Sequence, residues 1–159
     1  NLPAFMERFP DSKIIYMVRD PVNVLPSGLS LVTGVLDKRF GFWSLPKNKR
    51  DQYIDRLYTA LVELLKRFHD DYVSGRIDRS RVFIVRYDRM MDNFEDVMSG
   101  IFKFTGFRPS DLLIENVKKT AENQRHYISK HAYDLKKFGL DKERIRNDCS
   151  FLYETFLKE

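Results

Sequence analysis

The sequence predicts an α/β fold, and three observations support this prediction. Residues 13–18 and 82–86 are short apolar runs with β-branched and aromatic members, which is typical of buried parallel strands. Each run is followed by long segments whose apolar residues recur at helical spacing. The sequence shows little sign of the tight turns that join antiparallel strands. Strands that alternate with helices in this way build layered α/β domains.

The composition fits one globular domain that handles negative charge. The chain has 159 residues, of which 43% are hydrophobic, and this is enough for a single domain with a core. Lys and Arg outnumber Asp and Glu by 28 to 23, which suits an anionic ligand, a polyanion or an acidic surface. The single cysteine, Cys149, excludes an internal disulfide, and with only three histidines we expect no metal site.

Targeting signals are missing from the sequence as it stands. No apolar stretch reaches the roughly 18 residues that a membrane span needs, and no signal peptide opens the chain. We therefore expect a cytoplasmic protein without a membrane span. Because Asn1-Leu2-Pro3 is an unusual start, we also expect that a preceding segment belongs to the protein.

The start of the chain is predicted as helix, strand and helix. Residues 2–9 place apolar side chains on one helical face, and Pro10 ends this helix before the first strand. Pro21 suits the first position of a second helix, which we expect to run to about Val35. Pro26 then marks either a kink or the end of the first turn.

Residues 37–50 form a segment of a different kind. Five cations surround three aromatic residues here, with Gly41, Pro46 and Asn48 as helix breakers. Such a basic loop could line a substrate entrance or stack on bases. The interpretation that we favour is a solvated loop whose Trp43 is buried in the core.

The longest predicted helix covers residues 51–74, with Asp51 as its N-cap and Gly75 as its stop. His69 lies beside Asp70 near the end of this helix. Because neighbours along a helix do not face each other, we interpret His69 as part of a solvated surface.

The second half of the chain is predicted as a strand and three helices. Tyr87 follows the strand at residues 82–86 and should emerge at the same edge of the sheet as the end of the first strand. A basic loop is expected at residues 121–135. The helices are predicted at residues 93–105, 110–120 and 141–159.

Arg19 lies where the first strand ends and a helix begins. In open α/β sheets ligands bind at the carboxyl ends of strands, and helix N-termini favour anions. A guanidinium at this point suits a phosphate, to which Ser27 could add a hydroxyl from eight residues further on. The alternative is that Arg19 pairs with Asp20 or another acid while Ser27 is a cap. The residues alone leave both interpretations open.

Two parallel strands are too few for a stable sheet. We expect further strands from weaker segments of this chain or from a segment that precedes it.

Three segments in combination resemble the sulfotransferase family: residues 13–21 with Ser27, residues 82–90, and residues 131–140. The resemblance covers essentially the whole chain in order. It implies a P-loop-kinase-like layered α/β fold with a central parallel sheet. It also implies the co-substrate 3′-phosphoadenosine 5′-phosphosulfate (PAPS), whose desulfo product is PAP.

The resemblance also implies which residues bind this donor. In the family, an Arg and a Ser with the spacing of Arg19 and Ser27 bind the 3′-phosphate of PAPS. Tyr87 matches a family tyrosine near the nucleotide, although Asp88 replaces the usual Glu and Arg89 the usual acid.

A late basic loop of the family closes over the nucleotide. Arg125 and Lys130 fall in the region of this loop and are our candidates for it.

The sequence departs from the family upstream of the first strand. The family's 5′-phosphosulfate loop and its general base lie there, and nothing before Lys13 matches either. We therefore expect residues 1–159 to be a single sulfotransferase-like domain that lacks its N-terminal P-loop-like part, with the catalytic residues upstream of Asn1.

The resemblance implies transfer of a sulfuryl group from PAPS to a hydroxyl or amine of a small-molecule or carbohydrate acceptor. We expect no metal and no nucleic-acid partner.

Two other functions stay open from the sequence. One is a P-loop kinase-like phosphotransferase, which would prefer ATP or ADP to PAP. The other is a non-catalytic basic module that binds a nucleotide or polyanion through residues 37–50 and 121–137, with a steep dependence on salt.

Overall fold

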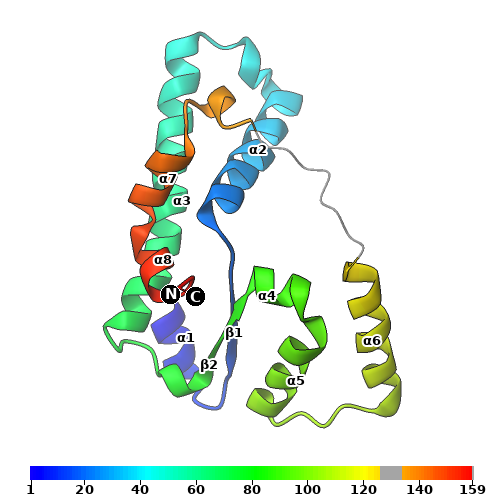
Figure 1. Cartoon of the computed structure of the whole chain (residues 1–159). Helices are drawn as coiled ribbons and strands as arrows, with labels where there is room; N and C mark the ends of the chain where they lie inside the picture. The colour runs from blue at the N-terminus through cyan, green and yellow to red at the C-terminus, as the bar shows by residue number, and fades with distance from the viewer. Residues whose placement is uncertain (126–133, 159) are drawn as a thin grey trace. The chain divides into compact units, whose positions relative to one another are not determined.

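A computed structural model of the chain describes residues 1–125 and 134–158. The chain, drawn in Figure 1, divides into two compact units. The first unit contains Asn1–Arg19 and Asp71–Lys130, and the second contains Asp20–Asp70 and His131–Glu159.

The first unit is built on two parallel strands. β1 (Ile14–Val18) pairs with β2 (Val82–Arg86) in register from the first residue of each strand to the last. The parallel pairing of the two apolar runs is confirmed. Because the strands end at the same level, Arg19 and Tyr87 follow them at one edge of the sheet.

The helices of this unit cover only part of the strand pair. α5 covers one face over β2, because Gly100 leaves room for the Phe83 ring: a Cβ on Gly100 would lie 2.9 Å from that ring. Phe83 also contacts Phe104 of α5, with ring centres 5.3 Å apart. The helical segments are α1 (Leu2–Arg8), η2 (Arg79–Arg81), α4 (Tyr87–Asp92), α5 (Phe94–Thr105) and α6 (Asp111–Arg125).

The first strand is less buried than its sequence predicts. Ile15 and Met17 are 46% and 48% exposed, whereas Val18 on the opposite face is 2% exposed. Ile15 pairs with Phe83, so α5 covers the β2 half of this face and leaves the β1 half open to solvent. The prediction of a buried strand is therefore wrong for Ile15 and Met17, and the layered P-loop-kinase-like arrangement stays a prediction.

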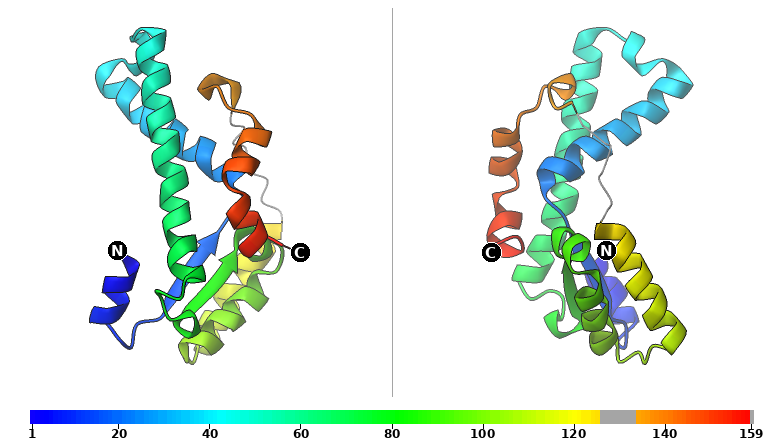
Figure 2. Two further views of the ribbon diagram at one scale, coloured as in Figure 1. Left: turned by 90° about the vertical axis from the view of Figure 1, so that its left-hand side faces the viewer. Right: turned by 45° about the vertical axis from the view of Figure 1, so that its right-hand side comes forward.

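The second unit is helical. Figure 2 shows its two long helices, α2 (Pro21–Phe40) and α3 (Lys47–Val73). The last residues of α3, from Asp71 onward, belong to the first unit. Shorter segments complete the unit, namely η1 (Phe42–Ser44), η3 (Lys136–Phe138), α7 (Lys142–Asp148) and α8 (Ser150–Thr155). The centre of its core consists of side chains that are at most 1% exposed: Leu25, Leu29, Ile145, Cys149 and Leu152.

Several helix ends differ from the predicted ones. α2 continues through Pro26 and past Val35, and it ends only at Gly41, which has φ +64° and donates its N–H to the Asp37 carbonyl. Such a left-handed residue is a common helix stop, and glycine adopts it without steric cost.

α3 also begins earlier than predicted. The Pro46 carbonyl accepts the N–H groups of Lys49 and Arg50, so the helix starts at Lys47 and Asp51 is not its cap.

Two predictions for the end of the chain are corrected. α6 runs to Arg125, so the first residues of the expected basic loop are helical. The predicted last helix is divided at Cys149, where φ −112° and ψ 20° leave the helical region. Asp141 caps α7 as a helix start, because its carboxylate accepts the Arg144 N–H at 2.8 Å.

Within the described residues, no helix combines the length and the apolar character that crossing a bilayer requires. The same residues contain no group of His, Cys, Asp and Glu side chains that could hold a metal ion.

Candidate functional site

The carboxyl edge of the strand pair carries Arg19 and Tyr87. The guanidinium carbon of Arg19 lies 4.2 Å from the centre of the Tyr87 ring, which is a cation–π contact. Both side chains are half-buried. The prediction that Tyr87 emerges at the same edge as Arg19 is confirmed.

Arg19 makes no ion pair with any residue in the described part of the chain. The alternative that it pairs with a surface acid is thus not supported there. An arginine that is held by an aromatic face keeps its N–H donors available, and these donors match the oxygens of a phosphate.

Arg86, the last residue of β2, is bound differently. Its Nε donates to Asp88 at 3.1 Å, and a second guanidinium nitrogen also pairs with this carboxylate. The hydrogen bond from Arg86 is the main reason why the pKa of Asp88 lies below its usual value. The charge of Arg86 is therefore neutralised next to the strand end, while that of Arg19 is not.

In the second unit, Asp20 fixes the start of α2. Its carboxylate accepts the N–H of Val22 at 2.9 Å and the hydroxyl of Tyr153 from the last part of the chain. Burial, and then the hydrogen bond to Asp20, raise the pKa of Tyr153. Sequence reasoning missed this role of Tyr153, because a tyrosine in an apolar stripe does not reveal a polar partner 133 residues away.

The other predicted donor-binding residues lie in several places. Ser27 is half-buried on α2 in the second unit, whereas Arg19 belongs to the first. Arg125 is the last residue of α6, and Lys130 lies outside the described residues. That these four residues bind one nucleotide stays a prediction.

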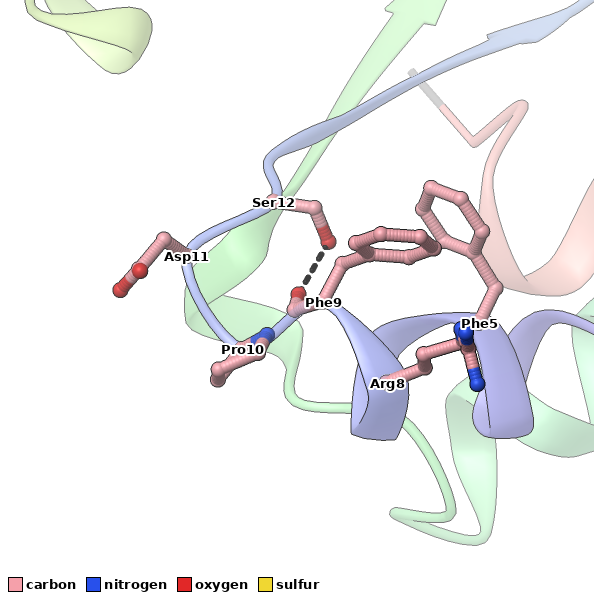
Figure 3. A pocket seen from close by; sticks show the side chains of 6 residues that line it. All are labelled: Phe5, Arg8, Phe9, Pro10, Asp11 and Ser12. Carbon is pink, nitrogen blue, oxygen red and sulfur yellow. Dashed lines mark hydrogen bonds between the residues drawn. The ribbon is translucent and has the colours of Figure 1, made fainter.

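An apolar hollow of about 430 Å³ opens beside α1 (Figure 3). The rings of Phe5 and Phe9, 4.9 Å apart, form its apolar wall. It lies at the amino end of β1, so the five-residue strand, about 17 Å long at 3.3 Å per residue, separates it from Arg19. This hollow is therefore not part of the candidate phosphate site at Arg19. Its lining residues are Phe5, Arg8, Phe9, Pro10, Asp11 and Ser12.

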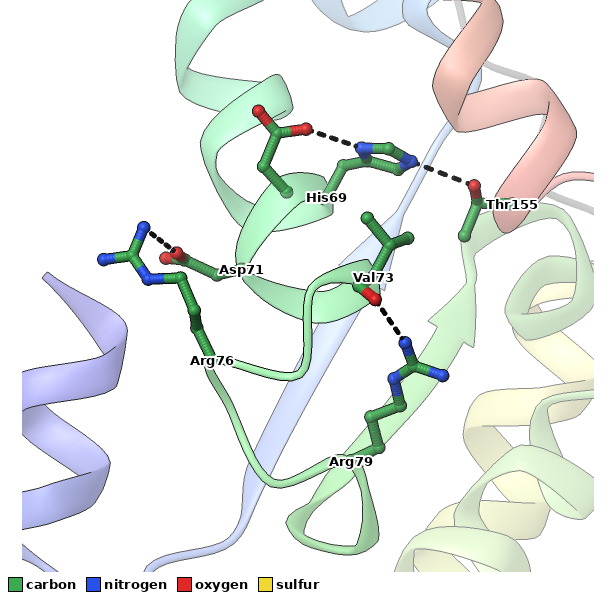
Figure 4. A network of polar contacts seen from close by, with 7 residues as sticks. His69, Asp71, Val73, Arg76, Arg79 and Thr155 are labelled. Atoms are coloured by element: carbon green, nitrogen blue, oxygen red, sulfur yellow. Dashed lines mark hydrogen bonds and ion pairs between the residues drawn. The ribbon is translucent and has the colours of Figure 1, made fainter.

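His69 is bound on both sides of its ring (Figure 4). Nδ1 is hydrogen-bonded to the Asp70 carboxylate at 2.9 Å, and Nε2 is hydrogen-bonded to the Thr155 hydroxyl at 3.1 Å. The ring also packs against Phe151 at 5.0 Å, and the side chain is only 15% exposed. The interpretation of His69 as solvated surface is wrong, because α8 packs on this end of α3 and supplies a partner that helix periodicity does not reveal.

The same figure shows two contacts of the first unit. Arg76 pairs with the buried Asp71 at 3.0 Å, and Arg79 donates to the Val73 carbonyl at 2.7 Å. Both contacts fix the chain between α3 and β2.

Comparison with known proteins identifies the family. A family model described as Sulfotransferase family matches residues 1–111, which include both strands and the residues Arg19, Ser27 and Tyr87. The chain belongs to the sulfotransferase family. No curated protein and no solved structure matched it.

For this sulfotransferase-family chain, the match also separates the candidate residues into two groups. The strand edge with Arg19 and Tyr87 lies inside the matched stretch, as does Ser27. Arg125 and Lys130 lie beyond it, so their assignment depends only on the resemblance of the late basic loop.

Proposed function

We propose that this chain binds the donor of a sulfotransferase that moves a sulfuryl group from PAPS to a hydroxyl or amine acceptor. Membership in the sulfotransferase family supports sulfuryl transfer in general. The observation that supports the donor role is the half-buried Arg19, held by the Tyr87 ring at the carboxyl edge of the strands.

Arg19 is the main anion-binding group in this proposal. Its guanidinium can bind the 3′-phosphate through two parallel N–H donors, and Ser27 adds a hydroxyl. Such a site also distinguishes PAPS from ATP, because ATP has no 3′-phosphate and would leave the cation without its partner.

Sulfuryl transfer resembles phosphoryl transfer in that catalysis depends on positioning and on neutralising the developing charge. Within this proposal Arg19, Ser27 and Tyr87 position the far end of the donor. They take no part in the chemical step.

Binding of PAP to the whole chain tests the proposal by calorimetry. We expect Arg19→Ala to weaken PAP binding by about 2 kcal/mol, roughly thirtyfold, because a charge-assisted pair is lost. Arg108→Ala removes the same charge from an exposed loop of the same unit and should leave the affinity unchanged. Unchanged PAP affinity in Arg19→Ala, or no PAP binding by the unaltered chain, contradicts the proposal.

A thermal-shift comparison of PAP with ADP distinguishes the phosphotransferase alternative. A 3′-phosphate site predicts the larger shift with PAP. A larger shift with ADP would favour a kinase-like nucleotide site instead.

A further inference from the structure

The turn between α2 and α3 concentrates positive charge in the second unit. We call residues 38–50, together with Lys136 and Lys137 of η3, the hairpin tip (Figure 1). All of its cations except Arg50 are exposed. They are Lys38, Arg39, Lys47, Lys49, Arg50, Lys136 and Lys137.

Two nearby carboxylates already have partners within the second unit. Asp37 accepts the backbone N–H of Trp43 at 2.9 Å, and Asp51 pairs with Lys47 at 2.6 Å. Within the described residues, four other cations of the tip make no ion pair, namely Lys38, Arg39, Lys49 and Lys136. The tip therefore has a local excess of positive charge.

Large apolar side chains are exposed at the same place. Phe40, the last residue of α2, is 76% exposed, and Leu45 is 44% exposed. One and two turns before the tip, Val35 and Leu31 are 58% and 71% exposed. They are four residues apart, so they share one face of α2. Exposed apolar surface of this kind next to cations marks an interaction surface.

The Trp43 ring is not an open platform within this tip. The Lys137 ammonium lies 4.2 Å from its ring centre and the Arg50 guanidinium carbon lies 5.8 Å from it. Phe42 and Phe138 also pack against the ring, with centres 5.1 Å and 6.3 Å away. Bases of a single-stranded nucleic acid stack on free aromatic faces, and this ring offers little free surface to them.

We propose that the hairpin tip binds the surface of an anionic phospholipid bilayer. The cations contact headgroup phosphates and carboxylates, and Phe40 and Leu45 enter the boundary between headgroups and acyl chains. A soluble polyanion would satisfy the cations alone and leave both apolar side chains in water. A bilayer surface accommodates both features of the tip.

Co-sedimentation of the whole chain with phosphatidylcholine vesicles, with and without phosphatidylserine, tests this proposal. We expect binding to the vesicles that contain phosphatidylserine, and weaker binding as salt is added.

Two variants separate the charged and the apolar contributions. Lys38→Ala with Arg39→Ala should lower the partition coefficient about tenfold or more, because each cation near an anionic surface contributes to binding. Phe40→Ser should lower it about tenfold, because a phenyl ring no longer enters the interface.

Matched controls exist for both variants. Lys118→Ala with Lys119→Ala removes the same charge from exposed positions of α6, and Leu64→Ser removes a 63% exposed side chain from α3. Both controls should bind as the unaltered chain does.

Three results would overturn the proposal. Equal binding to both vesicle types excludes recognition of anionic lipid. Full binding by Phe40→Ser, with loss only in the charge variant, indicates a polyanion site instead. Equal losses in the charge variant and its lysine control indicate an effect of overall charge and not of the tip.

Discussion

Tyr87 shows how an aromatic partner affects the charge and orientation of an arginine. Its ring lies against the Arg19 guanidinium, which has no carboxylate partner among the described residues. An aromatic partner orients the guanidinium without neutralising it. In our interpretation, Tyr87 therefore acts by positioning Arg19.

This role predicts different effects for two substitutions of Tyr87. We expect Tyr87→Ala to weaken PAP binding about fivefold, the value of a typical cation–π contact of about 1 kcal/mol. Tyr87→Phe keeps the ring and should bind PAP as the unaltered chain does. Calorimetry with PAP measures both. Equal losses in the two variants would show that the hydroxyl, and not the ring, is the important group.

Cys149 is a second residue whose behaviour follows from its surroundings. Its side chain is 0% exposed, and burial, followed by the charges of Asp148 and Asp20, raises its pKa from 9.0 to about 11. Because the raised pKa favours the protonated thiol, Cys149 is a core residue and not a nucleophile at neutral pH.

The pKa of Cys149 predicts a loss of stability in alkali. Between pH 9 and 11 the unfolded thiol releases its proton while the folded thiol retains it, so the free energy of unfolding falls as pH rises. We expect Cys149 to contribute a loss of about 2 kcal/mol by pH 11. Urea unfolding at pH 8 and pH 11 measures it. Cys149→Ala, though less stable throughout, should show a smaller decrease, and an identical decrease would contradict the assignment.

At the scale of elements, one arginine attaches α1 to the strands. The Arg81 guanidinium donates to the carbonyls of Phe9 at 2.6 Å, Ser12 at 2.9 Å and Met6 at 3.3 Å. These carbonyls belong to the end of α1 and to the turn before β1, so Arg81 links both to the start of β2.

Loss of this link should loosen α1. We expect Arg81→Ala to reduce the protection of the α1 amides against hydrogen exchange by about 2 kcal/mol, since hydrogen bonds from a charged donor are lost. Arg108→Ala, at an exposed site of the same unit, is the matched control. Unchanged protection in Arg81→Ala would show that apolar contacts alone hold α1.

At the scale of the whole molecule, the two units differ in the size of their cores. Of the buried hydrophobic residues in the described part of the chain, twelve belong to the second unit and six to the first. The first unit also leaves one face of β1 half exposed through Ile15 and Met17. Burial of apolar side chains is the main source of folding stability, so the units should differ in stability.

This difference predicts the order of unfolding. We expect amides of β1 and β2 to exchange before those in the middle of α2 as urea is added, because fewer buried contacts protect them. Hydrogen exchange followed by mass spectrometry measures both sets. Protection of the strands that outlasts that of α2 would contradict this ranking.

Local patterns in the sequence were sufficient to predict the strand pair and the residues at its carboxyl edge. Residues 13–18 and 82–86 are short runs of apolar residues, and Pro21 begins a helix directly after the first of them, so the position of Arg19 followed from local chemistry. Helix ends were less predictable. Gly34 and Gly41 look alike in sequence, but only Gly41 adopts the left-handed conformation that ends α2.

The sequence by itself determined the α/β character, the parallel strand pair and the resemblance to the sulfotransferase family. The tertiary structure decided which partner each polar side chain has: Tyr153 for Asp20, Thr155 for His69 and Tyr87 for Arg19. It also decided that part of β1 faces solvent. The physical reason is that periodicity and caps are local properties, whereas hydrogen-bond partners and burial depend on residues far away in the chain.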